Sequence, residues 1–210
     1  MPLLLILSIL SPLVAIIAGF GTRKQTLLWY YPLTGFVFDV TISFLKRGLH
    51  MSHKWPANIF ILAEFILISC IYRKHLFRSR KAFILFVTGF SLAFTAHTLS
   101  YSLLEFNKTG SSIFTFIYII YGIYGLYTIL KKQDVIYLEK SWFFWLNVAL
   151  IIYASGNFLL FLFRDYMVRE NRELYLLLWK NVFLTLNIIK NLLLAVSLYR
   201  LSKEARHEPG

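Results

Sequence analysis

Long apolar stretches, separated by short polar and basic segments, recur along the whole chain. Each has about eighteen or more residues suited to hydrocarbon, the length a helix needs to cross a bilayer. The pattern therefore predicts an all-α, polytopic membrane protein with seven transmembrane helices and no separate soluble domain. The predicted helices are residues 2–20, 26–45, 55–72, 82–103, 113–130, 142–163 and 174–199, within a single domain of residues 1–210.

The first apolar stretch has a second interpretation, as a cleaved signal peptide. It lacks the basic segment that precedes the apolar part of such peptides. Ser8, Pro12, Ala15 and Gly19 recur at spacings of three and four residues. Small residues on one face allow membrane helices to pack closely, so we expect this stretch to be a helix of the bundle.

Composition supports the membrane assignment. Apolar residues make up 58% of the chain, against about 45–50% in soluble domains, and the mean hydropathy is +0.64. The net charge of +12 would suggest nucleic-acid binding in a soluble protein, but a chain embedded in a bilayer offers no continuous basic groove. We expect a bilayer with anionic headgroups as partner and no nucleic acid, while a small-molecule ligand and a membrane-protein partner stay open as alternatives.

Lys and Arg are distributed unequally between the predicted loops. Thirteen of the 22 fall on one side and seven on the other, with two inside the last predicted helix. The thirteen are Arg23, Lys24, Arg73, Lys74, Arg78, Arg80, Lys81, Lys131, Lys132, Lys140, Arg200, Lys203 and Arg206. Because cytoplasmic loops carry the excess of positive residues, we expect the N-terminus outside and the C-terminus in the cytoplasm.

Glu64 and Asp39 are the two carboxylic acids within predicted spans. Glu64 lies near the midpoint of its helix, and Asp39 lies slightly toward the outer side. An acid at this depth costs about 2.5–3.5 kcal/mol on insertion scales, so it usually faces the bundle interior and has a partner. Lys190, also near mid-depth, is the best partner for Glu64. The sequence leaves open whether Glu64 forms a proton, ion or ligand site or locks helix packing.

Pairs of polar residues one helical turn apart mark two further spans. These are Tyr153 with Asn157 and Asn187 with Asn191. Such groups either bind a polar ligand or join helices, contributing about 0.6–2 kcal/mol each. At 100° per residue, the last predicted helix carries its polar residues within about 120° of one another. Those residues are Lys180, Asn187, Lys190, Asn191 and Ser197.

The secondary candidates belong to the predicted helix 82–103. Ser91 and Thr95 are part of a stripe of hydroxyl residues on this helix, and His97 lies off the stripe. A hydroxyl stripe in a membrane helix faces protein or water rather than lipid, so packing and pore lining are both open interpretations.

No motif for catalysis, metal binding or cofactor binding is present in the sequence. Cys70 is the only cysteine, and no spacing of His, Asp and Glu resembles a metal site. A nucleophile elbow, a P-loop and a dinucleotide fingerprint are all missing. We therefore expect no catalytic residue, metal or cofactor, and a lipid-modifying membrane enzyme is a minor alternative.

Three motifs carry a resemblance to a known group. Asn58-x5-Glu64, the segment FWLNVALIIYASGNFLLF and Asn187-x3-Asn191 resemble small seven-helix membrane proteins of Bacteroidota-type bacteria. The resemblance covers most of the chain, implies an inner-membrane location and carries no activity with it. It directs attention to Asn58, Glu64, Tyr153, Asn157, Asn187 and Asn191, and away from Lys190.

A second resemblance is one of layout. A carboxylate in the third helix and a lysine in the seventh are similar to microbial rhodopsins, in which the lysine holds retinal. The residue four positions before Lys190 is Leu186 rather than an acid, and the third helix lacks the Arg and Trp pattern near the counterion. An opsin-like chromophore protein is therefore disfavoured.

These observations favour a non-enzymatic membrane protein whose polar interior binds a small ligand or a proton, as a sensor-like or transporter-like component. The alternative is a structural or accessory subunit of a membrane complex. The candidates for ligand or proton binding are Glu64, Asp39, Asn58, Tyr153, Asn157, Asn187, Lys190 and Asn191, with Ser91, Thr95 and His97 as secondary candidates.

Overall fold

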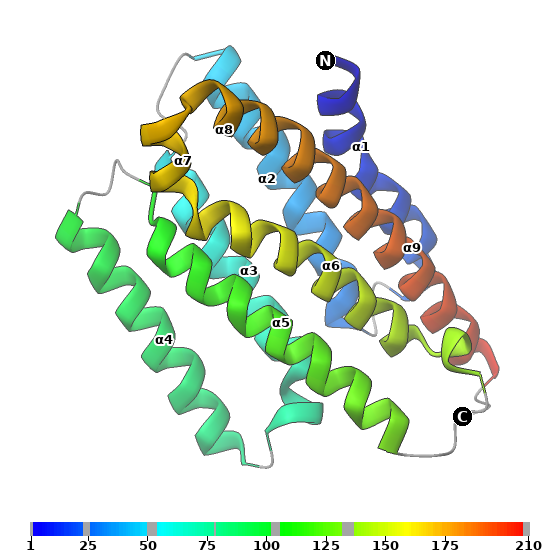
Figure 1. The fold of residues 1–210 in the computed structure, drawn as a ribbon. Helices are drawn as coiled ribbons and strands as arrows, with labels where there is room; N and C mark the ends of the chain where they lie inside the picture. The colour runs from blue at the N-terminus through cyan, green and yellow to red at the C-terminus, as the bar shows by residue number, and fades with distance from the viewer. Residues whose placement is uncertain are drawn as a thin grey trace.

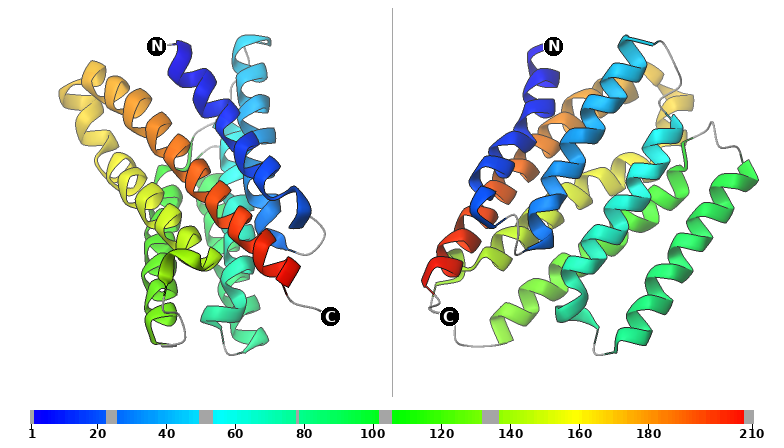
Figure 2. Two further views of the ribbon diagram at one scale, coloured as in Figure 1. Left: turned by 90° about the vertical axis from the view of Figure 1, so that its right-hand side faces the viewer. Right: turned by 180° about the vertical axis from the view of Figure 1, so that it is seen from behind.

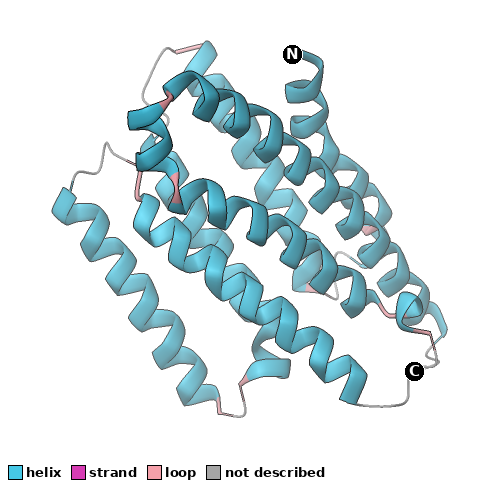
Figure 3. Ribbon diagram, in the orientation of Figure 1, coloured by secondary structure: helices cyan, strands magenta, loops and turns pink. Residues whose placement is uncertain are grey.

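The fold of the chain is a bundle of helices. The computed structural model describes residues 2–22, 26–49, 54–77, 79–101, 106–131 and 137–207. Within these ranges every regular element is a helix (Figure 3). The first helix begins and the last helix ends at opposite ends of the bundle, so the two ends of the chain lie far apart (Figure 1).

In the part of the chain that the structure describes, seven long helices lie over the seven apolar stretches. They are α1 (Pro2–Ala18), α2 (Tyr30–Arg47), α3 (Lys54–Leu76), α4 (Arg80–Tyr101), α5 (Lys108–Lys131), α6 (Trp142–Leu162) and α9 (Leu184–His207). Short 3-10 helices are Phe20–Thr22, Leu27–Trp29 and Leu138–Lys140. Several helices are longer than expected, because their terminal turns carry charged side chains that can extend from a membrane helix into the interface.

Five helices in the described ranges are long and apolar enough to cross a membrane. Four of them are α3, α4, α5 and α6, and the fifth is the continuous helix Arg172–Ala205 that contains most of α9. The segment Leu3–Ala18 of α1 is a shorter apolar helix. This composition indicates a multi-pass membrane protein.

Six of the long helices form a closed ring. In order around the ring they are α1, α2, α3, α5, α6 and α9, and α9 packs again on α1. The fourth helix, α4, lies outside the ring, against α3 and against Phe114 of α5, on which Phe94 of α4 stacks. Figure 2 shows α4 and α1 at opposite edges of the bundle. The interior of the ring is therefore lined by six helices.

The segment between α6 and α9 contains two short helices and a π-helical turn. The short helices are α7 (Arg164–Glu170) and α8 (Arg172–Leu178), and the π turn is Trp179–Phe183. A π turn holds more residues than an α turn, so it changes the phase of the helix. Lys180 is consequently exposed, whereas Asn187, Lys190 and Asn191 are buried. The prediction that Lys180 shares their face assumed a regular α-helix and is wrong.

Two glycines bring α5 and α6 into close contact. A Cβ atom at Gly125 would overlap the side-chain amide of Asn147, and one at Gly122 would lie 2.5 Å from Cγ1 of Ile151. The Asn147 amide accepts a hydrogen bond from the Tyr72 hydroxyl at 2.5 Å, which connects this contact to α3. Small residues thus allow a buried polar group to pack between helices.

The two ends of the bundle differ in charge. Helices α3, α5 and α9 end, and α4 and α6 begin, at the end where the C-terminus lies, which we call the basic end (Figure 1). The Lys and Arg residues of these helix ends include Arg73, Lys74, Arg80, Lys81, Lys131, Lys140, Arg200 and Lys203. Charged residues of the same predicted side of the membrane thus share one end of the structure.

Candidate functional site

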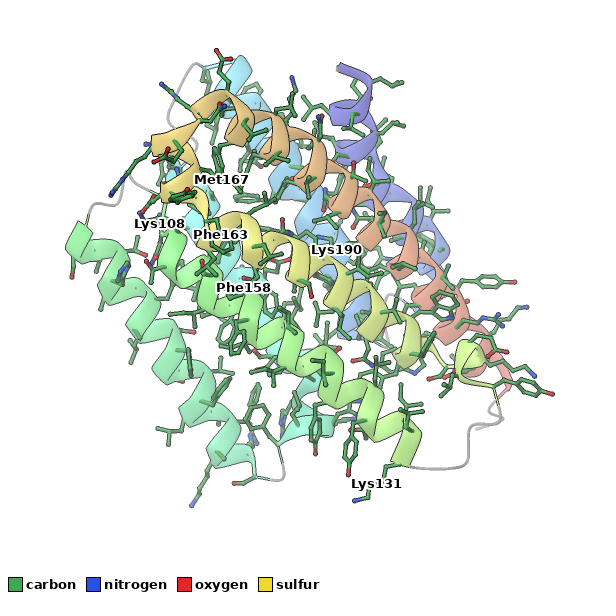
Figure 4. All side chains as sticks on the ribbon, viewed as in Figure 1. Lys108, Lys131, Phe158, Phe163, Met167 and Lys190 are labelled. Atoms are coloured by element: carbon green, nitrogen blue, oxygen red, sulfur yellow. The ribbon has the colours of Figure 1, made fainter. Side chains whose placement is uncertain are left out.

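The interior of the ring contains a buried polar cluster, which we call the polar chamber. Its members come from α1, α2, α3, α6 and α9, and each occupies the inward face of its helix. They are Ser8, Ser11, Tyr31, Asp39, Glu64, Tyr153, Asn187, Lys190 and Asn191. Lys190 lies near the middle of the bundle, far from both ends (Figure 4).

Glu64 has two partners from other helices. The Tyr31 hydroxyl of α2 donates a hydrogen bond to Glu64 Oε1 at 3.0 Å, and Lys190 Nζ of α9 lies 4.0 Å from the same oxygen. Glu64 and Lys190 are each only 5% exposed. The structure therefore forms the pair that mid-depth placement predicted. The pair includes Lys190, although the resemblance to the seven-helix group directed attention away from this lysine.

Two aromatic rings accompany the Lys190 ammonium. Its Nζ atom lies 4.1 Å from the centre of the Tyr153 ring and 5.3 Å from the centre of the Tyr31 ring. A cation held over an aromatic face is attracted by the electrons of the ring, more strongly where water is excluded. Tyr153 is thus a partner of Lys190, and Tyr31 contacts both members of the ion pair.

Asp39 and the two asparagines of α9 form the second half of the chamber. Asn187 donates to Ser8 Oγ at 3.0 Å and, in a longer contact of 3.5 Å, to Asp39 Oδ2. One turn later, Asn191 donates to Ser11 Oγ at 2.8 Å. These bonds attach α1 to α9. Asp39 is less buried than Glu64, and it interacts electrostatically with Lys190.

A small cavity lies beside the ion pair. Its volume is about 30 Å³, and its polar lining comes from Tyr31, Asp39, Tyr153, Asn187, Lys190 and Asn191. A cavity of this size holds about one water-sized particle. Sites for drug-sized ligands have about 300–1,000 Å³, so this cavity has no room for a chromophore of retinal size.

Asn58 lies away from the chamber. Its side-chain oxygen accepts a hydrogen bond from the backbone N–H of Asn107, and the Asn107 side chain donates to Thr98 Oγ1 of α4. Asn58 therefore joins α3 to the start of α5 and, through Asn107, to α4. This is a packing role that the spacing Asn58-x5-Glu64 does not reveal, because six residues along a helix turn the side chain to a different face.

Asn157 is buried on α6, one turn beyond Tyr153. It is 1% exposed, and neither atom of its amide has a hydrogen-bond partner among the described residues. The Tyr118 hydroxyl of α5 is likewise buried and has no hydrogen-bond partner among the described residues. Buried polar atoms of this kind usually bond to water or a ligand, so α5 and α6 carry two further polar groups that do not line the cavity.

The secondary candidates are all on α4, which contributes nothing to the chamber. Thr95 is exposed and its hydroxyl donates to the Ser91 backbone carbonyl within the same helix, at 2.8 Å. His97 is half-buried on α4. The hydroxyl stripe of α4 thus lies outside the ring and does not line a pore through it.

Sequence reasoning did not select Tyr31, Ser8 and Ser11 as site residues. A signal for Tyr31 existed, since Tyr31, Gly35 and Asp39 are four residues apart and share one helical face. Ser8 stood out only as a small residue for packing. Its role depends on contact with Asn187, 179 residues away, which no local pattern encodes.

The chamber contains two carboxylates, one ammonium and several amides and hydroxyls. Within the described ranges, no three side chains of His, Cys, Asp or Glu come together as a metal-ligand set. The arrangement can hold a proton, a water molecule or a small ion. Comparison of the chain with models of protein families, with curated proteins and with solved structures finds no match.

Proposed function

We propose that the polar chamber binds one proton or one small monovalent cation, and that the protein acts as a sensor-like or transporter-like component of its membrane. The observation that carries the proposal is the charge set of the chamber. Glu64 and Lys190 form an ion pair, and Asp39 faces the same lysine across a cavity of about 30 Å³.

The charges of the chamber do not balance when all three groups are ionised. Two carboxylates and one ammonium leave a surplus of one negative charge. A net charge inside a bilayer is costly. One proton on a carboxyl group, or one bound cation, would neutralise the set. The cavity has room for a particle of about the size of water, which matches these two ligands and excludes large ones.

Asp39 is the entry point in this proposal. It is only partly buried, whereas Glu64 and Lys190 lie deeper in the bundle. The Asn187 amide and the Tyr31 hydroxyl can hold the carboxyls in either charge state, because an amide both donates and accepts and a hydroxyl does likewise. Binding at Asp39 would then alter the competition between the two carboxylates for Lys190.

The proposed topology has seven membrane helices, with α1 and α2 crossing alongside the five apolar ones. Support comes from the packing of α1 on α9 and of α2 on α1 and α3, and from exposed apolar side chains such as Ile17 and Phe44. The basic end would face the cytoplasm and the N-terminus would lie outside. The resemblance to small membrane proteins of Bacteroidota-type bacteria would make the location an inner membrane.

Infrared difference spectroscopy of the purified, lipid-reconstituted protein tests the proposal. The buffer is switched between two pH values, and then between sodium chloride and choline chloride at constant pH. We expect a carboxyl signal that responds to one of the switches and is removed by Asp39→Asn or by Glu64→Gln. The exposed carboxylate variant Glu173→Gln is the matched control and should keep the signal. A spectrum that neither chamber variant changes would refute the proposal.

A second candidate function is that of an accessory subunit, and the exposure of α4 favours it. In the most apolar stretch of α4, only 17% is buried inside the bundle, against 39–44% in the other four candidate spans. The uncovered face is available to a membrane-protein partner. Affinity purification in mild detergent tests this, and recovery of the chain alone at every expression level would contradict it.

A further inference from the structure

A groove separate from the polar chamber lies between α5 and α6, at the end of the bundle opposite the basic end. Its volume is about 480 Å³, within the range of small-molecule sites. One wall is a stripe on α5 that includes Lys108, Ser112 and Phe116. The other is a stripe that runs from Phe158 and Leu162 on α6 to Asp165 on α7. Both stripes follow helical spacing, so their side chains face the same space.

The groove changes from polar to apolar along its length. Lys108 and Asp165 form an ion pair at its outer end. The rings of Phe116 and Phe158, with centres 5.7 Å apart, line the inner part. Eight residues of helix separate Lys108 from Phe116, a depth of about 12 Å. Figure 4 shows Lys108 near the start of α5, Phe158 deeper in the bundle and Lys131 at the far end.

This gradient matches an amphiphile whose headgroup sits at the membrane surface and whose chain enters the hydrocarbon. Phe116 is 50% exposed and Leu162 is 53% exposed, so the inner part of the groove is open to lipid. The ion pair is also accessible, since the Lys108 and Asp165 side chains are 42% and 53% exposed. Aromatic side chains provide the apolar contact area that such sites commonly use.

The charges at the outer end select between headgroups. An anionic headgroup would pair with Lys108 but would place its phosphate beside the Asp165 carboxylate, which repels it. A headgroup with a phosphate and an ammonium group would pair with both residues. A primary ammonium can donate hydrogen bonds to the carboxylate, whereas a quaternary ammonium has no N–H group. The positive end of α5, which begins at Lys108, adds to the attraction for the phosphate.

We propose that the groove binds one phospholipid of the phosphoethanolamine type, with its phosphate beside Lys108, its primary ammonium on Asp165 and one acyl chain along Phe116 and Phe158. The site is independent of the polar chamber. It also differs from the anionic lipid contacts expected at the basic end, because it contains a carboxylate as well as a lysine.

Native mass spectrometry of delipidated full-length protein tests this assignment. The protein is titrated with phosphatidylethanolamine, phosphatidylglycerol and phosphatidylcholine that have identical acyl chains. We expect phosphatidylethanolamine to bind roughly tenfold more tightly than either of the others, as one charge-assisted hydrogen bond would give. Asp165→Asn should remove this preference, and Phe158→Ala should lower the affinity for all three lipids by a similar factor.

Glu173→Gln is the matched control, because it removes an exposed carboxylate at the same end of the bundle, outside the groove. It should leave both affinity and preference unchanged. Asp165 is exposed, so its substitution is compatible with folding, which the unchanged circular dichroism spectrum of Asp165→Asn would verify. Equal binding of the three lipids by the wild-type protein, or a preference that survives in Asp165→Asn, would overturn the proposal.

Discussion

The Glu64 carboxylate and the Lys190 ammonium lie 4.0 Å apart in the middle of the bundle, both almost fully buried. Removing Lys190 would leave two carboxylates in the chamber without a cation, and removing Glu64 would leave Lys190 with only the less buried Asp39 as counter-charge. We expect Glu64→Gln or Lys190→Met to lower the free energy of unfolding by about 3–5 kcal/mol, and the double variant to lose much less than the sum. Equilibrium unfolding in mixed micelles measures this.

Lys180→Met is the control for the lysine change, since Lys180 is exposed on the same continuous helix. It should alter the free energy of unfolding by less than about 0.5 kcal/mol. Additive losses in the double variant would show that the 4.0 Å separation carries no energetic coupling.

The contact between Asn191 and Ser11 should stabilise the packing of α9 on α1. Asn191→Leu and Ser11→Ala each remove one side of a 2.8 Å hydrogen bond. In a double-mutant cycle we expect a coupling free energy of about 0.6 kcal/mol, typical of hydrogen bonds between membrane helices. A coupling of zero would mean that other contacts alone hold α1 in place.

Close packing at Gly125 gives a third prediction. Gly125→Ala would insert a methyl group into the space of the Asn147 amide, so we expect a loss of about 1–3 kcal/mol in unfolding free energy. Gly89→Ala on α4 is the matched control, because a Cβ atom added at Gly89 would have nothing within 4 Å of it. That control should be neutral or stabilising by up to about 1 kcal/mol. Similar effects at the two sites would contradict the packing argument.

The ion pair between Asp165 and Lys108 predicts that its contribution to stability depends on pH. The Lys108 ammonium donates a hydrogen bond to the Asp165 carboxylate and lowers the pKa of this group below its ordinary value. The stabilisation is therefore complete above the unfolded-state pKa and is lost as the pH falls through the lower folded-state pKa. Because the pair is exposed, its effect on stability is small.

Carbon-13 NMR of labelled aspartate in nanodiscs can follow this carboxyl directly. In Lys108→Gln we expect the pKa of Asp165 to rise toward its ordinary value, since the hydrogen bond and the charge of Lys108 are both lost and the influence of Arg164 and Arg169 is weaker. An unchanged pKa would mean that the two side chains do not pair in a bilayer.

Membrane topology provides a fifth prediction. Reporter fusions after Gly210 and in the loop before Asn107 should report opposite sides of the membrane, with the first in the cytoplasm. Reporters on the same side would contradict the proposed crossing by seven helices.

The seven apolar stretches predicted where the helices lie, because each stretch is long enough to identify a helix by itself. Depth along the helix likewise pointed to Lys190 as the partner of Glu64. The sequence did not reveal the position of α4 outside the ring, since apolar helices look alike whether they face lipid or protein. Tyr31 shares a helical face with Asp39, but the spacing alone did not show that this face meets Glu64, and the π turn at Trp179–Phe183 has no recognisable local signal.

The ring closes through contacts between segments that are far apart in sequence and are therefore synthesised at different times. Ser8 and Ser11 leave the ribosome early, yet their hydrogen-bond partners Asn187 and Asn191 emerge about 180 residues later. Lys190, the partner of Glu64, is likewise synthesised long after Glu64. During synthesis these polar groups therefore enter the membrane without their final partners, so a nascent chain that stops before α9 would expose them to lipid or to the insertion machinery.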